Sequence, residues 1–270
     1  MPGNYTVISL EKKDRVAEVF LNRPEKSNAM NPPFWPEIRD AFEKVNADPE
    51  IRAAIIAGNG KHFSAGLDLV ASASIFKGSE GSAELDSLYQ MVMEIQESFN
   101  AIEECRKPVI AAIHGVCIGG GLDLAAACDI RLASKDARFS LREVRVGMIA
   151  DVGSLNRIPR IIGEGHAREL AFTGKDLDAE RALRIGLVNE IYPDRDSCLA
   201  AARAMAGEIA EAAPLAVQGA KQVMNYCRDK SIRDGLDYVA ARNSLLLKSA
   251  DVFEAAAAFI QKRKPEFKGR

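Results

Sequence analysis

The chain has 270 residues, 47% of them apolar, which is enough for one large core or for a core with a smaller appendage. Its 36 basic and 38 acidic residues are interspersed and leave a formal charge of −2, so nothing favours nucleic acid or an anionic membrane as a partner. The five cysteines lack the spacing of a metal site, and the three that lie in apolar runs indicate small core residues in a reducing compartment.

The first two thirds of the chain predict strands that alternate with helices. Short β-rich or buried apolar runs predict strands, and an amphipathic pattern after two prolines predicts a helix. The expected strands are 6–10, 16–21, 53–57, 109–113 and 129–133, and the expected helix is 35–46. This alternation is typical of an α/β fold. A stretch rich in Ser, Gly and Ala at 71–86 predicts a mobile loop or lid.

From residue 195 onward the pattern is almost wholly helical. We expect helices at 200–213, 215–227, 232–249 and 251–262. The chain is therefore expected to divide into a core of residues 1–195 and a helical region of residues 196–270. Because no signal peptide, membrane-spanning run or peroxisomal tripeptide is visible, the expected location is cytoplasmic.

The most informative segment is the triple glycine at 119–121. It follows an apolar run and precedes an alanine-rich helical pattern. Glycines let the backbone turn sharply and approach a ligand, and the following helix directs free N–H groups toward that ligand. The pattern predicts a site for negative charge developing on an oxygen, or else a plain strand-to-helix bend. It matches neither the dinucleotide nor the phosphate-loop fingerprint.

A second loop of small residues, 62–69, follows the strand at 53–57. Taken alone, it is compatible with a simple surface turn. Together with the glycine turn, it could supply a second N–H group, so that two donors grip one oxygen of a thioester or similar carbonyl.

Three acids are candidates for proton chemistry: Asp123, Glu143 and Asp151. Glu143 and Asp151 are eight residues apart among apolar neighbours, so burial should disfavour their charged forms and raise their pKa values. Two carboxyls around one small pocket also repel, which allows one to hold a proton while the other is ionised. Such a pair can take a proton at one carbon and return one at another.

Each acid also has a structural alternative. Glu143 could pair with Arg142 or Arg145, and Asp151 could cap a helix that starts near residue 153. Asp123 could be an acid favoured by the dipole in the first turn of a helix.

Other chemistries lack support in the sequence. The three histidines, His62, His114 and His166, are scattered without a Ser or Cys partner, which argues against a nucleophilic triad. No spacing of His and Cys predicts a metal site. Asp129 follows an apolar helix and is expected to be a structural ion-pair partner.

Four segments together carry a family resemblance: 63–68 (FSAGLD), 118–123 (IGGGLD), 127–130 (ACDI) and 143–147 (EVRVG). With these, the chain resembles the crotonase (enoyl-CoA hydratase/isomerase) superfamily, and the likeness runs from residue 21 to residue 267. The resemblance implies a spiral of ββα units and a helical C-terminal region that mediates trimer formation, often with dimers of trimers. It also implies acyl-CoA thioester substrates, with no cofactor beyond the CoA that the substrate carries.

The motif match assigns binding roles to particular residues. The resemblance implies an oxyanion hole made by the backbone N–H groups of Leu67 and Gly120. It also implies that residues 23–27 approach the phosphates of CoA. The residues expected to bind substrate or CoA are Ala65, Gly66, Leu67, Asp68, Leu69 and Gly120.

Within the superfamily, the acids select the reaction. Hydratases carry Glu at positions 123 and 143 and a small residue at position 151, whereas this chain has Asp123, Glu143 and Asp151. This set, with the segment 148–153, resembles the Δ3,5-Δ2,4-dienoyl-CoA isomerases, which act in the β-oxidation of unsaturated fatty acids. In the implied mechanism, Asp151 takes the proton at C2 and Glu143 delivers one at C6. The sequence leaves open which of the two acids faces C2 and which faces C6. Asp123 would orient the pair.

Two other functions remain open from the sequence. One is a different crotonase-fold enzyme, either a hydratase or a Δ3-Δ2-enoyl-CoA isomerase. The other is a non-catalytic protein of the same fold that binds CoA or RNA, against which the three acids and the lack of a basic stripe argue.

Overall fold

A computed structural model describes residues 5–73 and 81–270 of the chain. In this part of the chain the main sheet has six strands, in the order β1-β2-β3-β4-β6-β9. The first two strands form an antiparallel hairpin, and the other neighbours are parallel. The strands are β1 (Ile8–Lys13), β2 (Val16–Leu21), β3 (Ala53–Gly58), β4 (Val109–Ile113), β6 (Ile130–Ser134) and β9 (Glu190–Tyr192). The α/β class is confirmed.

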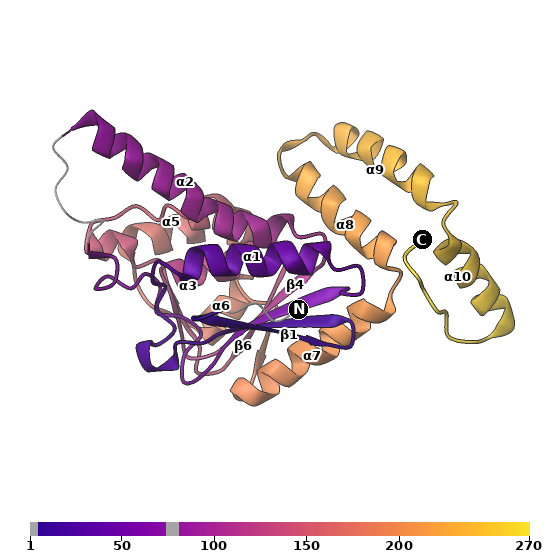
Figure 1. Ribbon diagram of the computed structural model, residues 1–270, viewed down its shortest axis with the longest axis horizontal. Helices are drawn as coiled ribbons and strands as arrows, with labels where there is room; N and C mark the ends of the chain where they lie inside the picture. Colours follow the sequence, from indigo (N-terminus) through magenta and orange to yellow (C-terminus); the bar gives the residue numbers. More distant parts are fainter. Residues whose placement is uncertain (1–4, 74–80) are drawn as a thin grey trace.

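The central strands β3 and β4 are buried along their whole length and carry no polar side chain. Along β3, Ala54 and Ile56 join the larger core, while Ile55 and Ala57 join a second core on the opposite face. This division follows from the two-residue period of a strand. The larger core lies under α1 (Phe34–Ala47), α2 (Ser82–Glu104) and α3 (Gly120–Ala127), and the second lies under α7 (Arg195–Glu211). Figure 1 shows α1 and α7 on opposite sides of the sheet.

A smaller sheet of three strands, in the order β5-β7-β8, leads into the candidate site. Its first strand, β5, directly precedes the triple glycine and α3. The elements of this part are β5 (Val116–Ile118), β7 (Arg138–Ser140), β8 (Leu177–Asp178), the 3₁₀ turns η1 (Pro24–Lys26) and η3 (Glu143–Val146), and the helices α4 (Ser154–Ile162), α5 (Glu164–Thr173) and α6 (Ala179–Arg184).

The C-terminal region is helical, as expected. Beyond α7 it contains α8 (Pro214–Tyr226), the 3₁₀ turn η4 (Cys227–Asp229), α9 (Ile232–Leu246) and α10 (Ala250–Gln261). The expected division near residue 195 coincides with the start of α7, but α7 itself packs on the sheet. In Figure 1, α9 and α10 stand apart from the sheet. No helix in the described residues is long and apolar enough to span a bilayer.

Asp129 is a structural ion-pair partner, as predicted. Its Oδ2 accepts from Lys221 Nζ at 2.7 Å and from the Val109 backbone N–H at 2.7 Å. Lys221 is buried on α8, so this pair ties the C-terminal region to the edge of the core.

The loop predicted at 71–86 is only partly a loop. Residues 74–80 of that prediction lie outside the described residues. The prediction is wrong for residues 82–86, which form the first turns of α2. Leu85 and Tyr89 on these turns are exposed, and the buried residues of α2 all lie near its C-terminal end. The first turns therefore lack the buried apolar stripe that identifies a helix in a sequence.

Candidate active site

The triple glycine forms a sharp turn between β5 and α3. Gly119 has φ of +52°, a conformation that side chains with a Cβ rarely adopt, and α3 begins at Gly120. Ser140 on β7 accepts the Gly119 N–H through its carbonyl oxygen at 2.9 Å. The turn is therefore fixed, and the start of α3 directs its free backbone N–H groups outward.

The loop at 62–69 runs alongside β5 and meets this turn. Ser64 donates its N–H to the Val116 carbonyl and accepts from the Ile118 N–H, at 2.9 and 3.1 Å. As a result, a Cβ placed on Gly120 would lie only 3.8 Å from the Leu67 nitrogen. Within residues 5–73 and 81–270, the N–H groups of Leu67 and Gly120 have no hydrogen-bond partner. The structure thus brings together the two donors predicted for the oxyanion hole.

Both donors line a cavity of about 260 Å³. Its wall also contains all three predicted acids: Asp123, Glu143 and Asp151. Most of the remaining wall is apolar and comes from the 62–69 loop, α1, α2, β5 and the segment around η3. These apolar residues are Trp35, Ala65, Leu69, Met91, Val92, Ile95, Ile118, Val146, Met148, Ile149 and Val152. The contributions of α1 and α2 carried no recognisable motif in the sequence.

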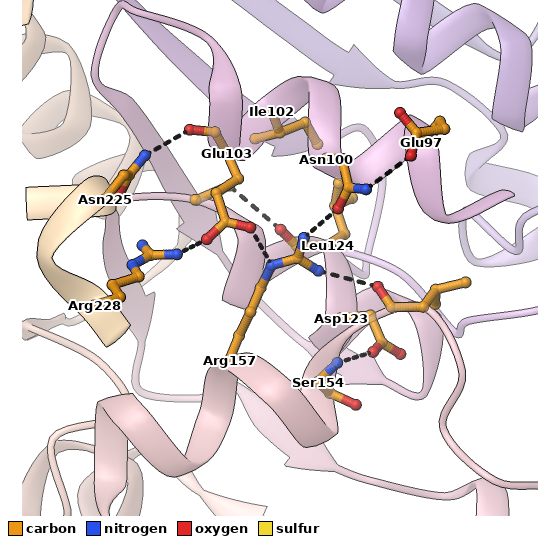
Figure 2. A network of polar contacts seen from close by, with 12 residues as sticks. Glu97, Asn100, Ile102, Glu103, Asp123, Leu124, Ser154, Arg157, Asn225 and Arg228 are labelled. Carbon is orange, nitrogen blue, oxygen red and sulfur yellow. Dashed lines mark hydrogen bonds and ion pairs between the residues drawn. The ribbon is translucent and has the colours of Figure 1, made fainter. Parts of the chain in front are cut away.

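Asp123 is fully buried in the first turn of α3. Its Oδ1 accepts the backbone N–H of Ser154, the first residue of α4, at 2.6 Å, as Figure 2 shows. Its Oδ2 is buried without a hydrogen-bond partner among the described residues. Burial, followed by the charge of Glu143, raises the pKa of Asp123 to about 7. Asp123 thus lies in the first turn of a helix, as its structural alternative predicted, and it also lines the cavity.

Glu143 begins η3 and is half-buried over the glycine turn. A Cβ on Gly119 would lie 3.2 Å from Glu143 Oε1, and Glu143 Oε2 has no partner in the described part of the chain. Burial and the charge of Asp151 raise the pKa of Glu143. The alternative of an ion pair with a neighbouring arginine is wrong, because Arg142 pairs with Asp176 and Arg145 donates to a carbonyl oxygen.

Asp151 lies between η3 and α4. The alternative role as a helix cap is wrong, because α4 is capped by Gly153 without a side-chain hydrogen bond. Although the residue as a whole is exposed, the protein around its carboxyl removes enough water to raise the pKa of Asp151. No side chain in the described residues bonds to this carboxyl.

The loop expected to bind CoA is held from the N-terminal side of the chain. Arg23 pairs with Asp68 at 3.0 Å and also donates to the Ala29 carbonyl, so its guanidinium holds this loop. Lys26, in the segment expected to approach the phosphates, is exposed. Buried Asn28 donates to the Asn59 and His62 carbonyls. No local sequence pattern predicted that role of Asn28.

Two unbonded N–H donors and three carboxyls with raised pKa values thus share one largely apolar cavity. This combination can stabilise an enolate oxygen and move protons along a bound carbon chain. In the described residues, no group of three or more His, Cys, Asp or Glu is arranged to hold a metal ion. All five cysteines are free thiols.

Comparison with known proteins identifies the family. The family model described as enoyl-CoA hydratase/isomerase matches residues 11–270. The chain therefore belongs to the enoyl-CoA hydratase/isomerase family.

Its relatives include dienoyl-CoA isomerases. The chain is 45% identical to the mitochondrial Δ3,5-Δ2,4-dienoyl-CoA isomerase of Dictyostelium discoideum, over 98% of this chain and 92% of that protein. It is 40% identical to the peroxisomal Δ3,5-Δ2,4-dienoyl-CoA isomerase of Arabidopsis thaliana, over 98% of each. Among solved structures, an enoyl-CoA hydratase from Bacillus anthracis matches with a TM-score of 0.90 and 30% identity, over 98% of this chain and 100% of that one. This likeness confirms the fold expected from the resemblance.

Asp123→Asn should change how stability depends on pH. Below about pH 4 the carboxyl is protonated in both the folded and the unfolded state. As the pH rises toward 7, only the unfolded chain releases this proton, so the wild type loses stability. The free energy of unfolding of the variant, relative to wild type, should therefore rise by roughly 2–4 kcal/mol between about pH 4 and pH 8. Urea titrations at several pH values measure it, and a difference independent of pH would contradict the raised pKa.

Gly120→Pro should remove one oxyanion donor, and its added Cβ would lie 3.0 Å from Met30 Sδ, so this side chain must shift slightly. Proline is tolerated at the first position of a helix, where its missing N–H has no intrahelical partner. We expect turnover of a thioester substrate to fall about 10²- to 10³-fold, with an unchanged circular dichroism spectrum. Gly165→Pro, in the first turn of α5 and away from the cavity, is the matched control and should retain activity. Full activity of the Gly120 variant would show that this N–H does not bind the substrate oxygen.

Proposed function

We propose that this protein is a Δ3,5-Δ2,4-dienoyl-CoA isomerase acting in the β-oxidation of unsaturated fatty acids. The observation that carries the proposal is the presence of Asp151 in the same cavity as Glu143 and the pair of free N–H groups. A hydratase needs two acids close to one double bond. A shift of two conjugated double bonds needs acids that reach carbons four positions apart. The dienoyl-CoA isomerases among the relatives support the same reaction.

The oxyanion hole is proposed to bind the thioester oxygen through Leu67 and Gly120. A proton on C2, next to the carbonyl, is only weakly acidic, and it becomes removable when the enolate oxygen receives two hydrogen bonds. The positive end of the α3 dipole lies behind Gly120 and favours the same negative charge. Loss of the C2 proton gives a dienolate whose charge extends over C2, C4 and C6.

The two outer acids are proposed to divide the proton transfer between them. In the proposed mechanism Glu143 holds a proton before the reaction and Asp151 is ionised; the raised pKa of Glu143, to which burial and then the charge of Asp151 contribute, supports this division. Asp151 then accepts the proton as the C2–H bond breaks, and Glu143 supplies a proton as the C6–H bond forms. The double bonds move from C3 and C5 to C2 and C4. No cofactor is needed, because CoA enters as part of the substrate.

Asp123 is proposed to orient this pair. With a pKa of about 7, it exchanges its own proton near neutrality. Its Oδ1 accepts from the first residue of α4, so Oδ2 is the oxygen that has no hydrogen-bond partner in the described residues. In the proposed mechanism, Asp123 is coupled to the pair through the charge of Glu143, which helps to raise the pKa of Asp123, and it does not contact the carbon chain.

An absorbance assay tests the proposed function. Wild-type protein added to a 3,5-dienoyl-CoA should produce the conjugated 2,4-dienoyl-CoA band, with little hydration of crotonyl-CoA in parallel. Asp151→Asn and Glu143→Gln should each lower turnover by about 10²-fold or more, because an amide neither accepts nor donates the required proton.

The controls separate catalysis from binding. Both variants should keep the wild-type affinity for a saturated acyl-CoA. Rapid crotonyl-CoA hydration without a new band would make the protein a hydratase. No turnover of either substrate would favour a non-catalytic binding protein. Undiminished turnover by one of the variants would show that the substituted acid does not take part in the mechanism.

We further propose that the protein assembles as a trimer through its C-terminal helices. α9 and α10 stand away from the sheet and expose large apolar side chains: Ile232, Leu236, Leu245, Phe253, Phe259 and Ile260. A set of this size is typical of a protein interface, and further copies of this chain are the expected occupants. Dimers of trimers are the larger assembly expected from the family.

Sedimentation velocity tests the assembly. At micromolar concentration we expect the mass of a trimer or of a hexamer, and Phe259→Glu with Ile260→Glu should dissociate it. A monomeric wild type would contradict this proposal. The cytoplasmic location stays a prediction, since the two named isomerase relatives are a mitochondrial and a peroxisomal protein.

A further inference from the structure

The segment that carries Asp151 is held in place by side chains from two helices. On α2, Gln96 Nε2 donates to the Asp151 carbonyl oxygen at 2.6 Å. On α4, Arg157 Nη1 donates to the carbonyl oxygen of the next residue, Val152, at 3.1 Å. Neither Gln96 nor Arg157 lines the cavity. Both therefore act on the backbone that places the Asp151 carboxyl and not on the substrate.

Arg157 is fixed by partners on all of its guanidinium nitrogens. Nε pairs with Glu103 at 2.8 Å, and Nη2 donates to Asn100 Oδ1 at 2.8 Å, both on α2. Figure 2 shows that Glu103 is also gripped from the C-terminal region: Arg228 pairs with its carboxyl, and Asn225 donates to its carbonyl at 3.0 Å. The side chain of Arg157 is only 10% exposed. Such a buried guanidinium, with each nitrogen hydrogen-bonded to a different residue, is rigid, and lysine cannot reproduce it.

The backbone provides space for this guanidinium. Gly153 has φ of +117°, and a Cβ on it would overlap the Arg157 side chain. Glycine is thus favoured at position 153 for two reasons: the backbone has a positive φ there, and the Arg157 guanidinium packs directly against it. The contact between Arg157 and the segment of residues 151–153 is therefore buried and closely packed, unlike an ordinary surface contact.

The helix that holds Asp151 also borders the substrate cavity. Met91, Val92 and Ile95 of α2 line the cavity, and Gln96 directly follows them. The Asp151 carboxyl has no side-chain partner of its own in the described residues, so its position depends on its backbone. A displacement of about 1 Å of a reacting group can cost about 10²-fold in rate.

We propose that Gln96 and Arg157 are positioning residues for the proton transfer by Asp151. They fix the Asp151 backbone to α2, the same helix that lines the cavity, and so set the distance between the carboxyl and the reacting carbon. This inference rests on the proposed isomerase function.

The test compares kcat with substrate binding in Gln96→Leu and Arg157→Lys. Gln96→Leu removes the amide donor at nearly constant volume, and Arg157→Lys keeps the charge but loses the fork. We expect kcat with 3,5-dienoyl-CoA to fall about 10- to 100-fold. KM and the affinity for a saturated acyl-CoA should stay within about threefold of wild type, because the oxyanion hole and the CoA loop are untouched.

The matched controls lie on the same helices. Gln90 on α2 and Arg160 on α4 are exposed, and the described part of the chain offers them no hydrogen-bond partner. Gln90→Leu and Arg160→Lys should keep the wild-type kcat. In an Asp151→Asn background, Gln96→Leu should cause no further loss, because the group that it positions is already inactive.

The outcomes separate this inference from the proposed function. A wild type that does not isomerise the dienoyl-CoA overturns the proposed function and this inference with it. An active wild type with kcat of both variants within twofold overturns this inference alone. A loss of activity that follows the folded fraction, measured by thermal unfolding, or that continues undiminished in the Asp151→Asn background, shows a structural role and also overturns it.

Discussion

The site depends on a close approach of two backbone segments. Ser64 and Cys117 pair as a parallel bridge, and the hydrogen bonds on either side of it bring the 62–69 loop against the glycine turn. Any Cβ on Gly121 would collide with Ser64, so the approach requires glycine. The proposed binding of a substrate oxygen depends on this contact. It places two N–H groups, which have no partners in the described residues, at the wall of one cavity.

The second constraint is electrostatic. Three carboxyls share an apolar cavity, and burial raises the pKa of each. A fully buried acid such as Asp123 costs stability whenever it must ionise, and the fold accepts this cost at the place where proton transfer is proposed. Two carboxyl oxygens in the cavity, Asp123 Oδ2 and Glu143 Oε2, have no hydrogen-bond partner in the described residues. Unpaired buried carboxylate oxygens of this kind are expected where a substrate completes the site.

Part of this organisation was predictable from the sequence, and the reasons are local. The strands at 16–21 and 109–113 have the predicted bounds, because apolar runs between turn residues leave little choice. The triple glycine and the three acids were identified from residue type and family resemblance, and the structure places them around one cavity. Asp129 was correctly assigned to an ion pair.

What could not be predicted depends on contacts distant in sequence. The first turns of α2 were missed because Leu85 and Tyr89 do not form a buried stripe there. Gln96 and Arg157 each resemble an ordinary polar helix residue, and only the fold brings them to the carbonyl groups of residues 151 and 152. From spacing alone, the structural alternatives for Glu143 and Asp151 were favoured over the catalytic roles. They failed because each neighbouring arginine found a partner across the fold and because Gly153 caps α4.

In the proposed mechanism, two carboxyls, one ionised and one protonated, divide the proton transfer between C2 and C6. A single turnover in D₂O, with enzyme in excess over 3,5-dienoyl-CoA, tests it most directly. Glu143 would carry solvent deuterium before the substrate binds. We therefore expect NMR to locate one deuterium at C6 of the 2,4-dienoyl-CoA product. Recovery of the original C2 hydrogen at C6 would show that a single group carries the proton along the chain and would contradict the account.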